Sequence, residues 1–153
     1  MRPRGDAQAM EFNLAALSEA VADAIPDREC IVWRDRRLTY GQVRDRTRRL
    51  AHHLRAAGLG ARTERAGLEG HQSGQDHLAC YLHNGNEYLE AMLGSYKARV
   101  APFNVNYRYV AEELRYLLNV ARAEAIVFHS AFADRLAEVL PDLPALTVLL
   151  QVD

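Results

Sequence analysis

Polar side chains follow three apolar segments of this sequence, at positions where they could contact a ligand. The polar runs are His83–Asn86, Asn104–Tyr109 and His129–Ser130. If the apolar segments are parallel strands of an open sheet, their carboxyl ends share one edge, and such sheets bind ligands at that edge. The sequence therefore predicts a polar rim, in which Arg108 is available for an anion and the asparagines can donate hydrogen bonds.

The same residues also have a structural interpretation. Asparagine and glycine are common turn formers, and a serine such as Ser130 can cap a helix. Both interpretations stay open for each residue, and the segment from Asn104 to Arg108 is the ligand-facing candidate.

Acid–base, metal and nucleophile chemistry find little support in the spacing of the remaining residues. Glu112 and Glu113 are adjacent on an expected helix and point about 100° apart, so they favour the helix start rather than a shared site. The histidines have no metal-ligand spacing, and the serines lack the glycines of a nucleophile turn. We therefore assign no catalytic and no metal-binding residue.

Phosphate-binding motifs are not found either. The glycines between Gly58 and Gly74 do not fit a dinucleotide-binding loop, and Gly-Lys-Ser/Thr does not occur. Lys97 is the only lysine of the sequence and lies inside an expected helix, so it is not a phosphate-loop lysine. No cofactor-binding residue is assigned.

The periodicity of apolar residues predicts an α/β fold with a mostly parallel sheet and crossover helices. Expected strands are 30–33, 78–82, 100–103, 125–128 and 146–150, and expected helices are 14–25, 39–57, 87–98, 111–119 and 130–140. Residues 34–37 are expected to form a polar turn, and 60–76 a long loop that we interpret as mobile. Because no helix follows the last strand, one sheet face needs cover, and self-association or docking through that face is expected.

Composition narrows the environment and the partners. The 153 residues carry a net charge of -1, which gives no electrostatic reason to expect nucleic acid as a partner. Cys30 and Cys80 form no cluster and are expected to be free thiols in a reducing compartment. No apolar run is long enough for a transmembrane segment. We expect a cytoplasmic protein with a disordered tail over residues 1–12.

Two segments resemble the start of acyl-CoA synthetases, members of the adenylate-forming (AMP-binding) ligases. The segment LTYGQV at 38–43 is similar to the family's LTY-x-E-L opening, with Gln42 and Val43 in place of the usual acid and leucine. The segment KARVAPFN at 97–104 is similar to K-x-G-A-V-x-V-P-L-N, with Arg99 at the usual glycine. The resemblance covers about residues 11–153.

The resemblance implies a ligase that uses ATP, Mg and coenzyme A on a carboxylic acid substrate. The acid first becomes an acyl-adenylate and then a thioester. In the family, four features lie downstream of the matched part: the loop that binds the phosphates, the acid that binds magnesium, the aspartate that binds the ribose, and a lysine of the C-terminal domain. No position here therefore inherits those roles. Residues 13–153 are thus expected to be an incomplete N-terminal part of an AMP-binding domain, inactive alone. The alternatives are a non-catalytic nucleotide or acyl-CoA binding module and a protein-interaction fragment.

Overall fold

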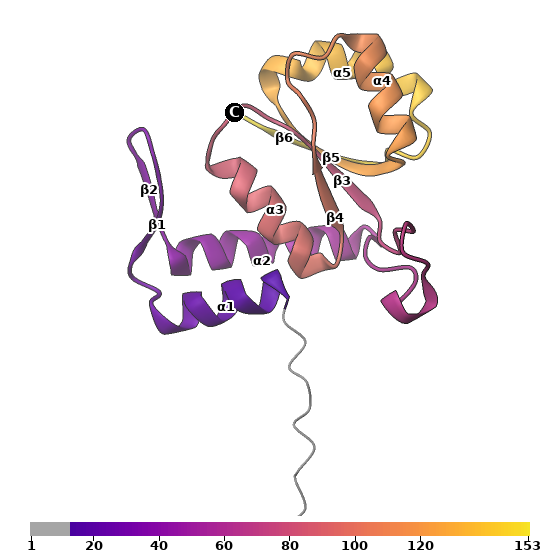
Figure 1. Ribbon diagram of the computed structural model, residues 1–153. Helices are drawn as coiled ribbons and strands as arrows, with labels where there is room; N and C mark the ends of the chain where they lie inside the picture. The colour runs from indigo at the N-terminus through magenta and orange to yellow at the C-terminus, as the bar shows by residue number, and fades with distance from the viewer. Residues whose placement is uncertain (1–12) are drawn as a thin grey trace, which may run out of the picture.

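The computed structural model describes residues 13–153, so the tail expected at 1–12 lies outside the described residues. At its centre is a four-stranded parallel sheet with the strand order β4-β3-β5-β6 (Figure 1). The strands are β3 (His77–Tyr81), β4 (Ala101–Asn104), β5 (Ala123–His129) and β6 (Val148–Val152). This confirms the predicted α/β class with a parallel sheet, and the predicted strands are present with slightly shifted ends.

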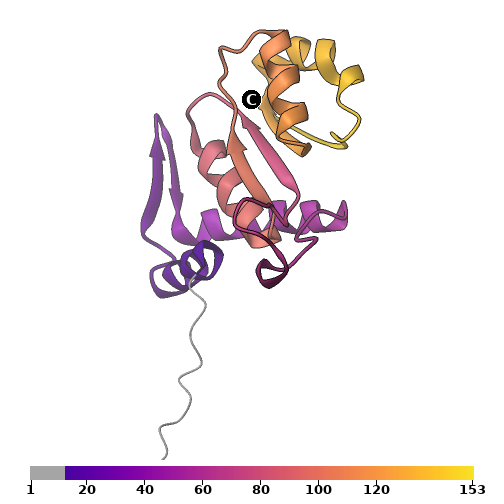
Figure 2. The same ribbon diagram turned by 45° about the vertical axis from the view of Figure 1, so that its right-hand side comes forward.

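Helices cover both faces of the sheet, as a parallel sheet requires. On one face lie α2 (Tyr40–Ala56) and α3 (Asn86–Ala98), with α1 (Leu14–Ala24) packed against both. On the other face lie α4 (Ala111–Val120) and α5 (Ala133–Val139) (Figures 1 and 2). The layers are therefore helix, sheet and helix.

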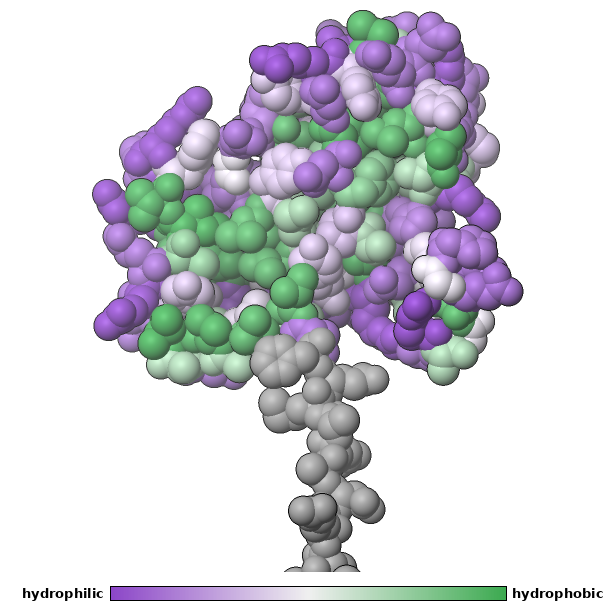
Figure 3. Space-filling view, viewed as in Figure 1, coloured by the Kyte–Doolittle hydropathy of each residue, from purple (hydrophilic) through white to green (hydrophobic). Residues whose placement is uncertain are grey.

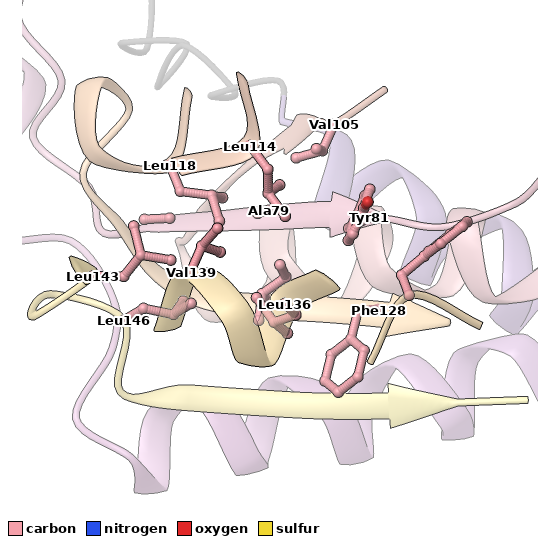
Figure 4. Packing of buried hydrophobic residues seen from close by; sticks show 13 residues of the cluster. Ala79, Tyr81, Val105, Leu114, Leu118, Phe128, Leu136, Val139, Leu143 and Leu146 are labelled. Carbon is pink, nitrogen blue, oxygen red and sulfur yellow. The ribbon is translucent and has the colours of Figure 1, made fainter. Parts of the chain in front are cut away.

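Strand β3 contributes side chains to two separate cores. Ala79 and Tyr81 belong to the cluster under α4 and α5, where Leu114 and Leu136 are also fully buried or nearly so (Figure 4). Leu78 and Cys80 belong to the cluster under α2 and α3. The alternation follows from the two-residue period of a strand, and it leaves β3 almost without exposed surface.

Several predicted helix ends are confirmed by their hydrogen bonds. The Asn13 side chain accepts from the Ala16 N–H at 2.8 Å and so caps α1. Thr39 and Gln42 form the expected capping box at the start of α2. The Glu113 carboxylate accepts from the Val110 N–H at 3.0 Å, which confirms its role at the start of α4. Gly58 follows α2 with φ of 83°, a conformation that glycine adopts without strain.

The prediction of a polar turn at 34–37 is wrong for residues 36 and 37. Residues Arg36–Thr39 form a strand, β2, that pairs antiparallel with β1 (Glu29–Trp33), and only Arg34 and Asp35 make the turn between them. The two arginines of β2 obscure it in the sequence, because their side chains are exposed and give no apolar alternation. Pairing with β1 forms the strand instead.

The long segment at 60–76 has more structure than a plain connection. Ala61 bridges antiparallel to Gln75, and the Gly74 carbonyl accepts from the N–H groups of Arg62 and Thr63 at 2.7 and 3.0 Å. Buried Asp76 accepts from the Arg62 guanidinium at 2.8 Å. These bonds close the segment at its base. Its mobility stays a prediction.

A polar network joins α1, α2 and α3 below the sheet. The Lys97 ammonium donates to the Thr47 hydroxyl at 2.7 Å and lies 2.5 Å from the Glu19 carboxylate, which also pairs with Arg48. Burial alone would raise the pKa of Glu19, but hydrogen bonds from Arg48 and Lys97 outweigh burial and hold that pKa below its ordinary value. The only lysine of the sequence is thus a packing residue, and its side chain is 8% exposed.

Some apolar surface remains outside the two cores. Leu14 and Leu17 of α1 are 57% and 45% exposed, and Figure 3 shows apolar atoms along this helix (Figure 3). Strand β6 lies at the sheet edge with Leu149 41% exposed. Self-association through the β6 side stays a prediction. Among residues 13–153, no helix is long and apolar enough to cross a membrane.

Leu54→Ala tests the core under α2. Leu54 is fully buried, so truncation removes apolar contacts and leaves a cavity, and we expect a loss of about 2–5 kcal/mol in the free energy of unfolding. Leu14→Ala is the matched control, because that leucine is 57% exposed. Urea unfolding followed by circular dichroism measures both variants. Equal losses in the two would contradict the core assignment.

Glu19→Gln tests the network around Lys97. Folding lowers the pKa of the Glu19 carboxyl below its ordinary value of 4.5. Such a carboxyl stabilises the folded state at pH values above its ordinary pKa, and this stabilisation is lost as the pH falls through its pKa in the folded state. We expect a lower melting temperature than the parent chain near neutral pH and a shrinking difference below pH 4.5. Exposed Glu138→Gln should match the parent at both pH values. A Glu19→Gln difference that stays constant with pH would argue against the ion pairs.

Candidate functional site

The carboxyl edge of the sheet carries a cleft of about 280 Å³. Its lining comes from three places: the tip of the β1–β2 hairpin, the segment between β3 and α3, and the ends of β5 and β6. The lining residues are Trp33–Arg36, Leu82–Glu87, His129, Val152 and Asp153. The predicted rim is therefore partly present, because His83, Asn84, Asn86 and His129 meet in one cleft.

One ion pair and one hydrogen bond fix the hairpin against α3. The Arg36 guanidinium donates to the Asn86 side-chain oxygen at 3.0 Å and to the Glu87 carboxylate at 2.7 Å. Buried Asn86 in turn donates to Glu90 at 3.0 Å, and Arg46 holds the same carboxylate with two bonds of 2.8 and 2.9 Å. Asn86 is thus committed to packing rather than available as a ligand donor, which answers the alternative left open by the sequence.

Four rings gather beside the cleft at the strand ends. The His83 ring lies 5.0 Å from Tyr107, 5.2 Å from His129 and 4.7 Å from Phe132, measured between centroids. Phe132 is buried, whereas His83 and Tyr107 are exposed. The cluster brings together polar residues from all three predicted runs or their neighbours, and it forms an aromatic wall rather than an acid–base pair.

The segment from Asn104 to Arg108 lies at the same edge but outside the cleft lining. The Arg135 guanidinium holds it by donating to the carbonyl oxygens of Tyr107 and Tyr109 at 3.2 and 2.8 Å. The Asn106 side chain accepts from the Arg108 N–H at 3.0 Å, the turn-forming role that asparagine commonly has. The Arg108 guanidinium lies over the Tyr107 ring at 5.1 Å. Its contact with a ligand stays a prediction.

Charges near the cleft are largely balanced by acids. Arg36 of the lining pairs with Glu87, and Glu90, which binds Asn86 of the lining, pairs with Arg46. Arg34 at the hairpin tip lies over the Trp33 ring at 5.4 Å and has φ of 53°. It is an exposed cation in the cleft lining, so an anionic ligand in the cleft would meet it.

The geometry gives this edge recognition groups rather than reactive ones. Within residues 13–153, no group of three or more His, Cys, Asp and Glu could hold a metal ion. Cys30 and Cys80 are free, and burial raises the pKa of the Cys80 thiol to about 12, which makes it unreactive. Lys97 lies in the helix network described above. The edge can therefore position a ligand.

The hairpin's part in this cleft is not predicted from the sequence. Trp33, Arg34 and Arg36 reach it only because a two-residue turn folds β2 back on β1. A signal was present: Arg34-Asp35 separates the apolar strand from Leu38, and two-residue loops are the commonest hairpin connections. Contact between the hairpin and α3 joins residues about fifty positions apart and has no local signature.

Comparison with known proteins agrees with this fold. A family described as AMP-binding enzyme matches residues 18–153. The medium-chain acyl-CoA ligase Mig of Mycobacterium avium is 57% identical over 141 residues, which are 92% of this chain and 26% of that relative. A medium/long-chain-fatty-acid–CoA/3-oxocholest-4-en-26-oate–CoA ligase of Mycobacterium tuberculosis H37Rv is 40% identical over 145 residues, 95% of this chain and 24% of that one.

A solved structure shows the same fold. The fatty acyl-CoA synthetase of Mycobacterium tuberculosis superposes with a TM-score of 0.77 at 19% identity, over 92% of this chain and 26% of that one. The chain thus spans about a quarter of the length of these relatives. With the sequence match extending over residues 18–153, this chain belongs to the AMP-binding enzyme family.

Proposed function

We propose that residues 13–153 form the N-terminal part of an ATP-dependent ligase that joins a fatty acid to coenzyme A. The observation that carries this proposal is the 57% identity to a ligase named for medium-chain acyl-CoA formation, over 92% of the chain. The second relative is named for medium- and long-chain fatty acids, so a fatty acid of medium length is the first substrate to test. The reaction would pass through an acyl-adenylate, as the family resemblance implies.

We further propose that these residues do not adenylate an acid by themselves. Adenylation needs donors and cations around the phosphates, where negative charge develops. The described residues do not fit that need. They include no candidate magnesium cluster, and Lys97, which lies away from the cleft, is paired with Glu19. Arg34 and Arg36 are the exposed cations of the cleft lining, and Arg36 is paired with Glu87. ATP and magnesium are therefore assigned to residues outside this part.

The role that remains for this part is positional. Its parallel sheet presents the hairpin, the ring cluster and the Asn104–Arg108 segment on one edge. These groups could border an acyl or nucleotide ligand held mainly by the rest of a ligase. The bidentate Arg46–Glu90 pair and the Arg36–Asn86 bond keep that border rigid.

ATP–pyrophosphate exchange on the purified 153-residue chain tests the absence of adenylation. With octanoate, decanoate and palmitate we expect no exchange above a blank without protein, because the phosphate-binding groups are missing from this part. A full-length fatty acid–CoA ligase at equal molar concentration is the positive control. Exchange that requires both the chain and the acid would overturn the proposed inactivity while supporting the ligase assignment.

A non-catalytic binding module is the alternative that the cleft favours. A cleft of about 280 Å³ bordered by an exposed arginine and aromatic rings can hold part of a nucleotide or of an acyl-CoA. In that case the function would be ligand capture without chemistry. The distinguishing property is binding by the isolated chain.

Calorimetric titration with ATP, AMP and octanoyl-CoA tests that alternative. If the cleft binds an anion, Arg34→Ala should weaken binding by about tenfold, the loss of roughly one charge-assisted hydrogen bond. Arg108→Ala reports whether the neighbouring segment takes part, and exposed Arg49→Ala on α2 is the control. Absence of binding for all three ligands would eliminate the binding-module function.

A further inference from the structure

A serine and a histidine meet at the opposite edge of the sheet, where the 60–76 segment enters β3. The Ser73 hydroxyl oxygen lies 2.7 Å from Nε2 of His77. Ser73 is exposed and His77 is half-buried. The pair lies at the amino end of β3, whereas the cleft lies beyond its carboxyl end, so it is separate from the candidate site above.

The other ring nitrogen of His77 determines which tautomer is present. Nδ1 lies 2.5 Å from the carbonyl oxygen of Ala121, and a carbonyl oxygen can only accept a hydrogen bond. Nδ1 therefore carries a proton. In the neutral ring Nε2 is then unprotonated and accepts the hydrogen bond that the Ser73 hydroxyl donates. The longer contact from Ser73 to the Gln75 carbonyl, at 3.4 Å, competes only weakly.

The backbone around the pair is fixed on both sides. Gly74 is buried, and a Cβ at this position would lie 2.3 Å from the Thr63 carbonyl oxygen, so the close approach requires glycine. The Glu124 carboxylate accepts from the His77 N–H at 2.7 Å and holds the start of β3. The serine and its base are thus positioned by the closed base of the segment and by the sheet.

These contacts match the requirements for nucleophilic catalysis: a hydroxyl hydrogen-bonded to a base that a third group orients. The third group here is a carbonyl oxygen instead of a carboxylate. It fixes the ring tautomer in the same way, although it stabilises an imidazolium less. The pair is not predictable from the sequence, because Ser73 lacks the flanking pattern of a nucleophile turn.

We propose that Ser73 and His77 form a nucleophile–base dyad that accepts the acyl group of an activated ester. The Ser73 oxygen attacks the ester carbonyl carbon while Nε2 of His77 takes the hydroxyl proton. The bond from carbon to the leaving alcohol then breaks, and His77 returns the proton to that oxygen. The products are an acyl-Ser73 ester and the free alcohol. This proposal does not rest on the ligase reaction, because the dyad does not involve the cleft.

A fluorophosphonate probe on the 153-residue chain, with p-nitrophenyl butyrate as the ester, tests the dyad. With the probe, Ser73 displaces fluoride at phosphorus and the adduct is stable. We expect one adduct per chain by intact mass, located on Ser73 by peptide mapping, and p-nitrophenol release with the ester. Ser73→Ala should abolish both signals. His77→Gln should slow them at least about a hundredfold, a usual contribution of a general base.

Two controls separate activation from simple exposure. Ser18→Ala, which removes a hydroxyl that donates to the Ala15 carbonyl, should leave the labelling rate unchanged. Chain unfolded in guanidinium should not be labelled, because the dyad exists only in the fold. This comparison of folded with unfolded parent chain does not depend on any variant folding.

Three results would overturn the proposal. They are no adduct on the folded parent chain, an adduct that persists in Ser73→Ala, and equal labelling of folded and unfolded chain. Circular dichroism of Ser73→Ala and His77→Gln verifies that loss of labelling does not come from unfolding. Retained labelling in folded His77→Gln at the parent rate would likewise rule out the base.

Discussion

Strand β3 is covered along both hydrogen-bonding edges and on both faces, and the rest of this structure depends on that constraint. It lies between β4 and β5, and its residues from Leu78 to Tyr81 are fully buried. Every backbone N–H and C=O of a buried strand needs a partner, and the two parallel neighbours supply them. Its side chains require cover above and below, so helices must occupy both faces. The three-layer arrangement follows from this one strand.

A strand buried along its length can present chemistry only at its two ends. At the carboxyl end the chain leaves β3 through His83 and Asn84, which meet the hairpin and the end of β5 in the cleft. At the amino end the 60–76 segment brings Ser73 to His77. The two edges differ in kind: the first is bordered by exposed rings and paired arginines, and the second has a single short contact between a hydroxyl and a ring nitrogen. Polar function is thus confined to edges by the same burial that stabilises the fold.

Local signals in the sequence were sufficient for most of the elements and insufficient for their contacts. The Thr39–Gln42 capping box, the Asn13 cap and the parallel strands were predictable because each depends on nearby residues or on apolar periodicity. Strand β2 was not, since its arginines show no alternation and its pairing comes from β1. Of the predicted rim, His83, Asn84, Asn86 and His129 reach one cleft, but Asn86 is used in packing. The contacts of Arg36 with Asn86 and of Ser73 with His77 arise from tertiary placement, which spacing alone does not encode.

The environment of Lys97 bears on the chemistry that these residues can support. A lysine that stabilises a phosphate must keep its ammonium free to reach charge developing on that phosphate. Here the ammonium donates to Thr47 and pairs with Glu19, three helices converge on it, and its side chain is almost fully buried. Withdrawing it would leave the Glu19 carboxylate with only Arg48 and would leave the Thr47 hydroxyl without the hydrogen bond it now accepts. The folded state therefore opposes such a movement, and the only lysine of the sequence stabilises the helical layer on which the candidate site is built.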